Sequence, residues 1–312
     1  MFSIFWFIGG PLTYFAAALF LVKTVSIILK YSKLPRHLRW DLYPVPHQGP
    51  EGSKYQKVDF SQIKPHSSLF HELKEMGQEM LFIKKAYINN PKVWMGSFPL
   101  HAGVYLGLAW LLMLVVGAIM ELNGVPVKAD AQSVLSVLVY YATLVAGVGS
   151  FIFGLCGSLV MLWLRTTDED MRFMSDVLSF FNLAVIIFLF GSGLTAWSLT
   201  DASFQMIRQH VADLLMFKPG SVKEPLIILQ MLAFCLFLIY LPFSRMMHFV
   251  GKYFFYHNIM WDDEMMKRNN AMENDIATYL QYKITWAAPH IKKGGSWVDQ
   301  VSERPSKEGD LK

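Results

Sequence analysis

Residues 100–122 read LHAGVYLGLAWLLMLVVGAIMEL, a run of 23 residues whose only full charge is Glu121. A helix of about 20 such residues crosses a hydrocarbon layer of about 30 Å. The whole chain of 312 residues is 54% hydrophobic and only 17% charged, whereas soluble proteins have about 25% charged residues. Comparable runs occupy residues 4–30, 134–164, 177–199 and 226–250. None alternates with a period of two, so we predict an all-α, polytopic membrane protein with five transmembrane helices.

The basic residues predict the orientation of these helices. Segments 31–99, 165–176 and 251–312 contain ten, two and nine Lys and Arg residues, whereas the two intervening loops contain one and three. Cytoplasmic segments carry the excess of basic residues in membrane proteins. No basic residue precedes Lys23, so the first run is typical of an uncleaved anchor. We therefore expect the N-terminus outside and the C-terminus in the cytoplasm.

Four regions follow from this topology: a first transmembrane helix (1–30), a cytoplasmic segment (31–99), a four-helix membrane region (100–250) and a cytoplasmic tail (251–312). In the cytoplasmic segment, residues 37–50 are rich in proline and are expected to be extended. Residues 69–87 have apolar side chains at spacings of three and four, which predicts an amphipathic helix that ends at Asn90-Pro91. The tail is rich in aromatic residues, so we expect it and the amphipathic helix to dock on a partner subunit.

Two of the nine histidines lie within or at the ends of apolar runs. His101 begins the second run, and His248 ends the fifth, which runs in the opposite direction. Both imidazoles are therefore expected at similar depth near the cytoplasmic surface, as the paired axial ligands of a membrane haem b require. Gly103 and Gly107 would then leave room for a flat macrocycle, and Arg245 could meet a haem propionate.

Each of these residues also has a structural interpretation. Histidines at helix ends can be interfacial polar groups, and Gly103 with Gly107 can be a helix-packing pair. Arg245 can extend to the membrane surface. Spacing alone therefore indicates a site without naming its cofactor.

The motifs FPLHAG (98–103) and PFSRMMH (242–248) resemble those of the cytochrome b (gamma) subunit of respiratory nitrate reductase. With the tail stretch YKITWAAPH (282–290), the chain is most similar to that family's DsrM, TmcC and HmeC type, the membrane subunits of redox complexes in sulfate reducers. The resemblance implies a bacterial or archaeal cytoplasmic membrane protein that exchanges electrons between menaquinone and a cytoplasmic HdrD-like iron–sulfur subunit. It also implies that a periplasmic multihaem cytochrome c can belong to the complex.

The family's nitrate-reductase branch holds a second haem with one further histidine on each of the same two helices. The corresponding positions here are Leu111 and Gln230, and only His210 remains on the outer side. We therefore expect one haem b, held by His101 and His248, and a menaquinone that reacts close to it. Lys23 and Gln230 are candidate quinone contacts, although a snorkelling lysine and an interhelical hydrogen bond are the better explanations of the two residues.

Two other classes of function stay open. One is a membrane anchor that has lost its haem and only holds soluble redox subunits in place. The other is a solute transporter, against which we find neither repeated halves nor a matched pair of broken helices. Lipid is an expected partner, and nucleic acid is not, because topology explains the basic segments.

Overall fold

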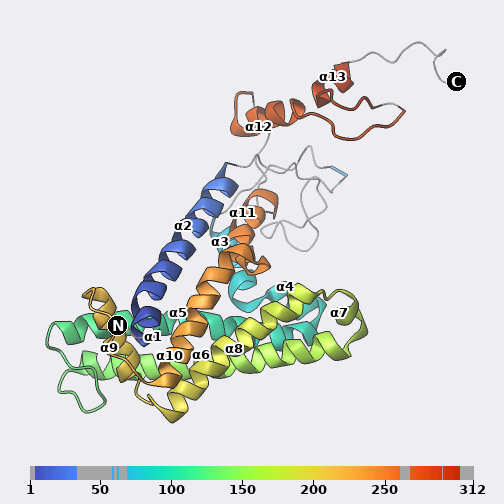
Figure 1. Cartoon of the computed structure of the whole chain (residues 1–312). Coiled ribbons are helices and arrows are strands. Elements are labelled where there is room, and N and C mark those ends of the chain that lie inside the picture. The colour runs from blue at the N-terminus through green and yellow to red at the C-terminus, as the bar shows by residue number, and fades with distance from the viewer. Residues whose placement is uncertain are drawn as a thin grey trace, which may run out of the picture. The chain divides into compact units, whose positions relative to one another are not determined.

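The computed structural model describes residues 4–33, 58–59, 62, 69–260, 268–289 and 291–302, without the side chains of 69, 71, 72, 255–260 and 272. The predicted extended stretch 37–50 lies outside these residues. The described chain is helical and contains five helices that are long and apolar enough to cross a membrane (Figure 1). They are Ile4–Ser32, Pro91–Leu122, Val134–Thr167, Val177–Leu199 and Pro225–Phe243. The prediction of an all-α, multi-pass membrane protein with five spans is confirmed; the orientation of the termini stays a prediction.

The first span contains an irregular turn. It consists of α1 (Ile4–Phe7), the π-helical turn η1 (Ile8–Leu12) and α2 (Thr13–Ser32). Pro11 lies inside η1, and it cannot donate the backbone hydrogen bond that a regular helix needs at that position. The hydroxyl of Thr13 donates to the Ile8 carbonyl across this turn (2.9 Å).

The second span begins earlier than the apolar run predicts. Helix α5 (Pro91–Leu122) starts nine residues before position 100, because the Asn90 side chain accepts a hydrogen bond from the Val93 N–H (3.2 Å) and Pro91 occupies the first helical position. His101 is therefore the eleventh residue of α5 and does not open it. Pro99 lies inside the helix without ending it.

The fifth span ends earlier than predicted. Helix α10 (Pro225–Tyr240) is followed by two 3-10 turns, η5 (Leu241–Phe243) and η6 (Arg245–Met247), with Ser244 extended between them. Pro242 lacks the N–H that would continue the helix, so the expected end of the span at residue 250 is wrong. His248 instead begins a separate helix, α11 (His248–Met260).

The predicted amphipathic helix 69–87 is two helices. They are α3 (Leu69–Phe82) and α4 (Lys84–Asn89), and Ile83 between them adopts a left-handed conformation with φ 53°. The Glu79 carboxylate accepts the Lys85 N–H (2.8 Å) across the junction, which stabilises the turn. Helix α4 ends just before Asn90-Pro91, as the sequence predicts.

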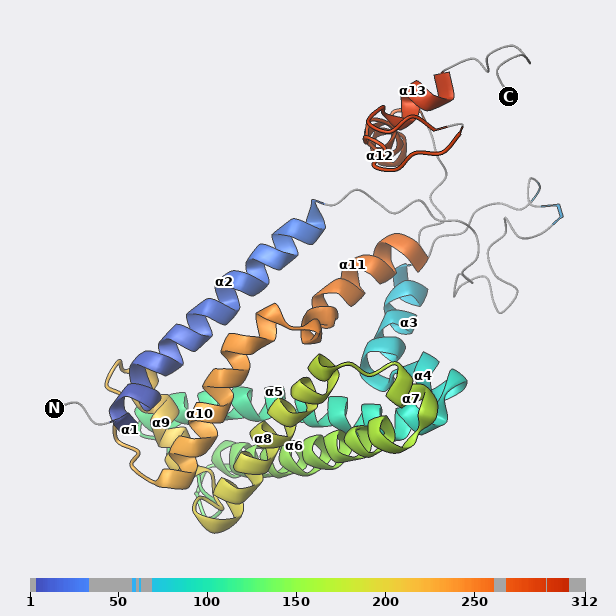
Figure 2. The ribbon, with the colours of Figure 1, turned by 45° about the vertical axis from the view of Figure 1, so that its right-hand side comes forward.

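Two compact units make up the chain. The first unit comprises Met1–Ile27 and Gly77–Phe249, and the second comprises Ile28–Met76 and Val250–Lys312. In the first unit, α5 packs along α6 (Val134–Thr167), α6 against α8 (Val177–Leu199), and α8 against α10 (Figure 2). The short α7 (Glu169–Phe173) follows α6, and α9 (Gln205–Leu215) packs on α5.

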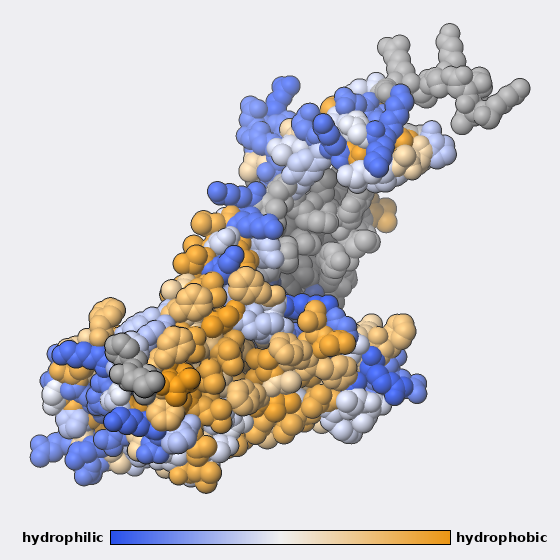
Figure 3. Space-filling model, viewed as in Figure 1, coloured by the Kyte–Doolittle hydropathy of each residue, from blue (hydrophilic) through white to orange (hydrophobic). Residues whose placement is uncertain are grey.

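Apolar side chains both fill and cover the first unit. Its buried core includes Trp110, Leu114, Phe151, Phe190 and Ile227. Large apolar side chains of the same helices also point outward, such as Leu108, Leu138 and Phe188, and the surface in Figure 3 is broadly apolar over the spans. A face of this kind is expected to contact lipid rather than water.

Candidate functional site

The two histidines singled out from the sequence lie beside each other. The His101 ring on α5 and the His248 ring at the start of α11 have centroids 6.1 Å apart, and their planes are inclined by 71°. The break at Pro242 changes how His248 is presented, since a 3-10 turn rather than α10 carries the chain to it. The predicted pairing across two elements is nevertheless present in the structure.

Each ring is oriented through its Nδ1 atom. The backbone carbonyl of Ser97 lies 2.7 Å from Nδ1 of His101, and that of Arg245 lies 3.2 Å from Nδ1 of His248. A carbonyl oxygen only accepts hydrogen bonds, so Nδ1 carries the proton in both rings. In a neutral imidazole this leaves the lone pair on Nε2, which is how metal-binding histidines are commonly prepared by their second hydrogen bond.

The spacing of the rings suits one metal ion between them. An imidazole nitrogen binds a metal at about 2 Å and lies about 1.1 Å from its ring centroid, so two such ligands on opposite sides of one metal place the centroids about 6.2 Å apart. The observed separation is 6.1 Å. No cluster of three or more His, Cys, Asp or Glu ligands occurs within the described residues. Two protein ligands are too few for a structural zinc site but suit a metal that brings four ligands in its own macrocycle.

Arg245 joins the segment before His248 to the start of α8. Its guanidinium donates to the Asp176 carboxylate (2.6 Å), and Asp176 also accepts the N–H and the hydroxyl of Ser179 at 2.9 and 2.6 Å. The Ser179 bonds, followed by those of Arg245, lower the pKa of Asp176 to about 2. Arg245 therefore has a structural role in fixing the turn before His248, and its contact with a propionate stays a prediction.

Gly103 and Gly107 face α6. A Cβ on Gly103 would lie 2.3 Å from the backbone nitrogen of Gly154, and one on Gly107 would lie 2.9 Å from the Ser150 hydroxyl. That hydroxyl donates to the Gly103 carbonyl at 2.8 Å. These contacts are the helix-packing alternative, so we assign both glycines to the α5–α6 contact instead of to cofactor packing.

The two candidate quinone contacts are not brought together. The Lys23 ammonium is exposed and lies 5.4 Å from the centroid of the Phe243 ring. Gln230 is buried on α10. It precedes Phe243 by thirteen residues, a rise of roughly 20 Å along a helix. The structure therefore does not bring Lys23 and Gln230 into one site, and their role as quinone contacts stays a prediction.

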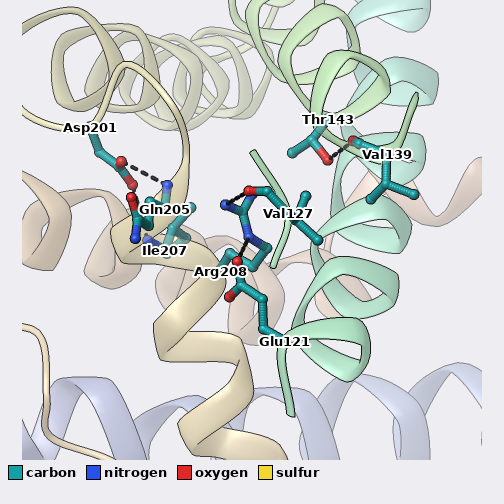
Figure 4. A network of polar contacts seen from close by, with 8 residues as sticks. All are labelled: Glu121, Val127, Val139, Thr143, Asp201, Gln205, Ile207 and Arg208. Atoms are coloured by element: carbon teal, nitrogen blue, oxygen red, sulfur yellow. Dashed lines mark hydrogen bonds and ion pairs between the residues drawn. The ribbon is translucent and has the colours of Figure 1, made fainter. Parts of the chain in front are cut away.

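A buried ionic network at the other end of the spans was missed by the sequence reasoning, which treated Arg208 only as a loop charge. Arg208 is 1% exposed; it donates to the Glu121 carboxylate and to the Val127 carbonyl, each at 2.9 Å (Figure 4). Asp201 accepts the N–H groups of Gln205 and Ile207 (2.8 and 3.0 Å) and so caps α9. The apolar spacing Ile207, Val211 and Leu214 was the signal in the sequence that could have revealed this packed helix.

His210 lies on the same helix and is 3% exposed. A Cβ on Gly9 of η1 would lie 3.3 Å from its Cε1 atom and 3.2 Å from the Met231 methyl group. Burial lowers the pKa of His210 to about 4, against a weaker opposing effect of the Asp213 carboxylate. His210 is thus a neutral packing residue of the network end, and it has no histidine opposite it among the described residues.

The fold and the site together define a class: a multi-pass α-helical membrane protein with one inter-helix histidine pair among the residues described. Comparisons of the chain with models of protein families, with curated proteins and with solved structures found no match.

Proposed function

We propose that this chain is the haem b subunit of a membrane-bound redox complex and that it exchanges electrons between a membrane quinone and a cytoplasmic iron–sulfur subunit. The observation that supports this proposal is the His101–His248 pair, with ring centroids 6.1 Å apart and both Nδ1 atoms held by backbone carbonyls. A haem bound there supplies reversible one-electron chemistry.

The chain's own residues hold and orient the site. Ser97 and Arg245 fix the two imidazole rings through their carbonyls, and the Arg245–Asp176 ion pair ties the turn before His248 to α8. Because α5 packs backbone to backbone on α6 at Gly103, the position of His101 is set by a rigid pair of helices. Such a pre-oriented ligand pair needs little rearrangement when a metal enters.

The proposed partner follows from what the chain lacks in its sequence. Its two cysteines, Cys156 and Cys235, are far apart and cannot ligate an iron–sulfur cluster, which commonly takes four thiolates. Electrons that enter or leave on the cytoplasmic side therefore require a second polypeptide. The HdrD-like identity of that subunit, the choice of menaquinone and the periplasmic cytochrome c partner all rest on the family resemblance.

One haem per chain is part of the proposal. Leu111 cannot ligate iron, Gln230 is not an expected haem ligand, and the opposite end of α5 is occupied by the Glu121–Arg208 network. His101 and Glu121 are twenty residues apart, about 30 Å along the helix. Within the described residues, His101 and His248 form the one ligand pair that we propose.

Optical spectroscopy of the purified protein, before and after reduction with dithionite, tests the proposal. We expect a b-type spectrum with one haem per polypeptide, and we expect His101→Ala and His248→Ala each to abolish it, because one imidazole cannot replace two axial ligands. His210→Ala is the matched control: it removes a histidine from the other end of the same unit and should leave the haem content unchanged.

The rival functions give different results. A wild-type protein without a haem spectrum contradicts the redox proposal and favours the anchor. Solute uptake by haem-free protein in proteoliposomes favours a transporter. A ratio of two haems per chain, with one lost in His210→Ala, would preserve the redox role but contradict the single site.

A further inference from the structure

The part of the second unit that follows α11 contains a small folded module, residues 268–289 and 291–302, which we call the tail module. It comprises α12 (Ala271–Leu280), a hairpin over residues 282–297 and α13 (Trp297–Ser302). The Ile284 N–H donates to the Gly295 carbonyl (2.9 Å), and the Gly294 N–H donates to the Ile284 carbonyl (2.8 Å). Ile284 is 3% exposed and forms the centre of the module, so the hairpin has a defined conformation.

Aromatic side chains of this hairpin are on its surface. Trp286 and Trp297 pack edge to face with ring centroids 6.4 Å apart, yet they are 49% and 39% exposed. Tyr282, four residues before Trp286, is 48% exposed, and Val301, one helical turn after Trp297, is 77% exposed. Apart from Leu280 at the end of α12, the large exposed apolar groups of the module thus lie on the hairpin and on α13.

The charges of the hairpin have a single sign. Residues 282–297 contain Lys283, Lys292 and Lys293 and no Asp or Glu. The nearest carboxylate, Asp299, accepts the N–H and the hydroxyl of Ser296 (2.9 and 2.7 Å) and so caps α13. Its charge is therefore directed to its own helix terminus. Lysines next to exposed tryptophan and tyrosine rings are the composition of a bilayer interface, where rings lie at the level of the headgroups.

The last span ends at Phe243, and the module begins only 25 residues later, at Arg268. A segment tethered so closely to the bilayer experiences a high effective concentration of headgroups, so even a weak surface affinity is sufficient for binding. The cytoplasmic leaflet is negatively charged and attracts basic segments. We propose that the hairpin 282–297 binds the surface of the bilayer through Trp286 and Trp297, with its lysines on anionic phospholipid headgroups. The sequence-based expectation that the aromatic tail contacts a partner subunit stays a prediction and is the alternative outcome of the experiment.

The test measures the depth of a spin label on the hairpin in the full-length protein in nanodiscs. Ala287, which is exposed beside Trp286, is replaced by Cys and labelled, with Cys156 replaced by Ala and the buried Cys235 retained. In discs of phosphatidylcholine with phosphatidylglycerol, we expect the label to be relaxed more by oxygen, which dissolves in lipid, than by a water-soluble nickel chelate. In discs of phosphatidylcholine alone, the preference should weaken or reverse.

Charge removal sharpens the test, since each lysine contributes roughly fivefold to binding at an anionic surface. Lys283→Gln with Lys293→Gln should lower the ratio of bound to unbound hairpin about 25-fold, and both changes are on exposed side chains that leave the backbone pairing intact. Arg268→Gln, in the same module but outside the hairpin, is the matched control and should change the ratio less than twofold.

A label that stays accessible to the nickel chelate in both kinds of disc overturns the proposal, and it is also the result expected if a protein subunit is the occupant of this surface. The same conclusion follows if the two lysine substitutions leave the depth unchanged. Neither readout depends on haem, so the outcome is independent of the proposed redox function.

Discussion

The two ends of α5 hold polar side chains in opposite ways. At the Glu121 end, Arg208 is buried and bonded, and α9 closes over it. At the His101 end, the histidine pair lies beside a broken helix, and His248 and Arg245 are exposed. At the Glu121 end, the polar groups bond to one another and stabilise the fold. At the His101 end, two ring nitrogens are held in place but are not enclosed by other side chains. Whether polar groups are enclosed or accessible therefore distinguishes a candidate functional site from a structural network better than their mere presence does.

The largest expected effect concerns the buried Glu121–Arg208 network. Arg208→Ala removes a buried cation and leaves the Glu121 carboxylate and the Val127 carbonyl without their donor, which should destabilise the protein by about 4 kcal/mol. Thermal unfolding in detergent measures the loss. Lys128→Ala is the control in the neighbouring loop; it breaks an exposed ion pair with Asp130 (3.3 Å) and should cost under about 1 kcal/mol. Equal effects of the two changes would show that the network is not structural.

The pH dependence of stability tests the burial of His210, which lies on α9 with Arg208. Its folded pKa of about 4 is below the ordinary value of 6.5, so the unfolded chain binds the proton more tightly. The contribution is fully present above pH 6.5 and is lost as the pH falls towards 4, by up to about 3 kcal/mol. We expect the free energy of unfolding of His210→Gln, measured in detergent at a series of pH values, to change less between pH 6.5 and pH 4 than that of the wild type. Loss below pH 4 in both proteins is expected from Asp176, whose pKa of about 2 produces a separate, more acidic window.

A smaller effect concerns the end of α5 that carries His101. Gly103→Ala places a methyl group against the Gly154 backbone, so α5 and α6 must separate, at a cost of about 2 kcal/mol. Because Gly103 follows His101 by two residues, we expect haem content to fall as well. The matched change Gly77→Ala meets nothing within 4 Å and should be neutral or slightly stabilising. Full haem content in Gly103→Ala would show that the helix contact does not set the ligand position.

Hydropathy was sufficient to predict five spans, because about 20 apolar residues have few alternatives to a membrane helix. Hydropathy misplaced the ends of two spans, because a local cap and a proline fix where these helices begin and end. The Asn90 cap extends α5, and Pro242 ends the fifth span early. The histidine pair could be anticipated because topology alone brings His101 and His248 to similar depth. The buried state of Arg208 could not, since it depends on α9 folding back onto α5, a tertiary contact between residues that are distant in the sequence.

The unequal lengths of the spans have a further consequence. Helices α5 and α6 contain 32 and 34 residues, about 48 and 51 Å, whereas α8 with 23 residues and the fifth span with 19 measure about 34 and 28 Å. Only the shorter two match the hydrocarbon thickness when upright; the longer two must lean or extend past it. A change in bilayer thickness is therefore expected to tilt α5 and α10 by different amounts. The separation of the His101 and His248 rings should then depend on the thickness of the host membrane.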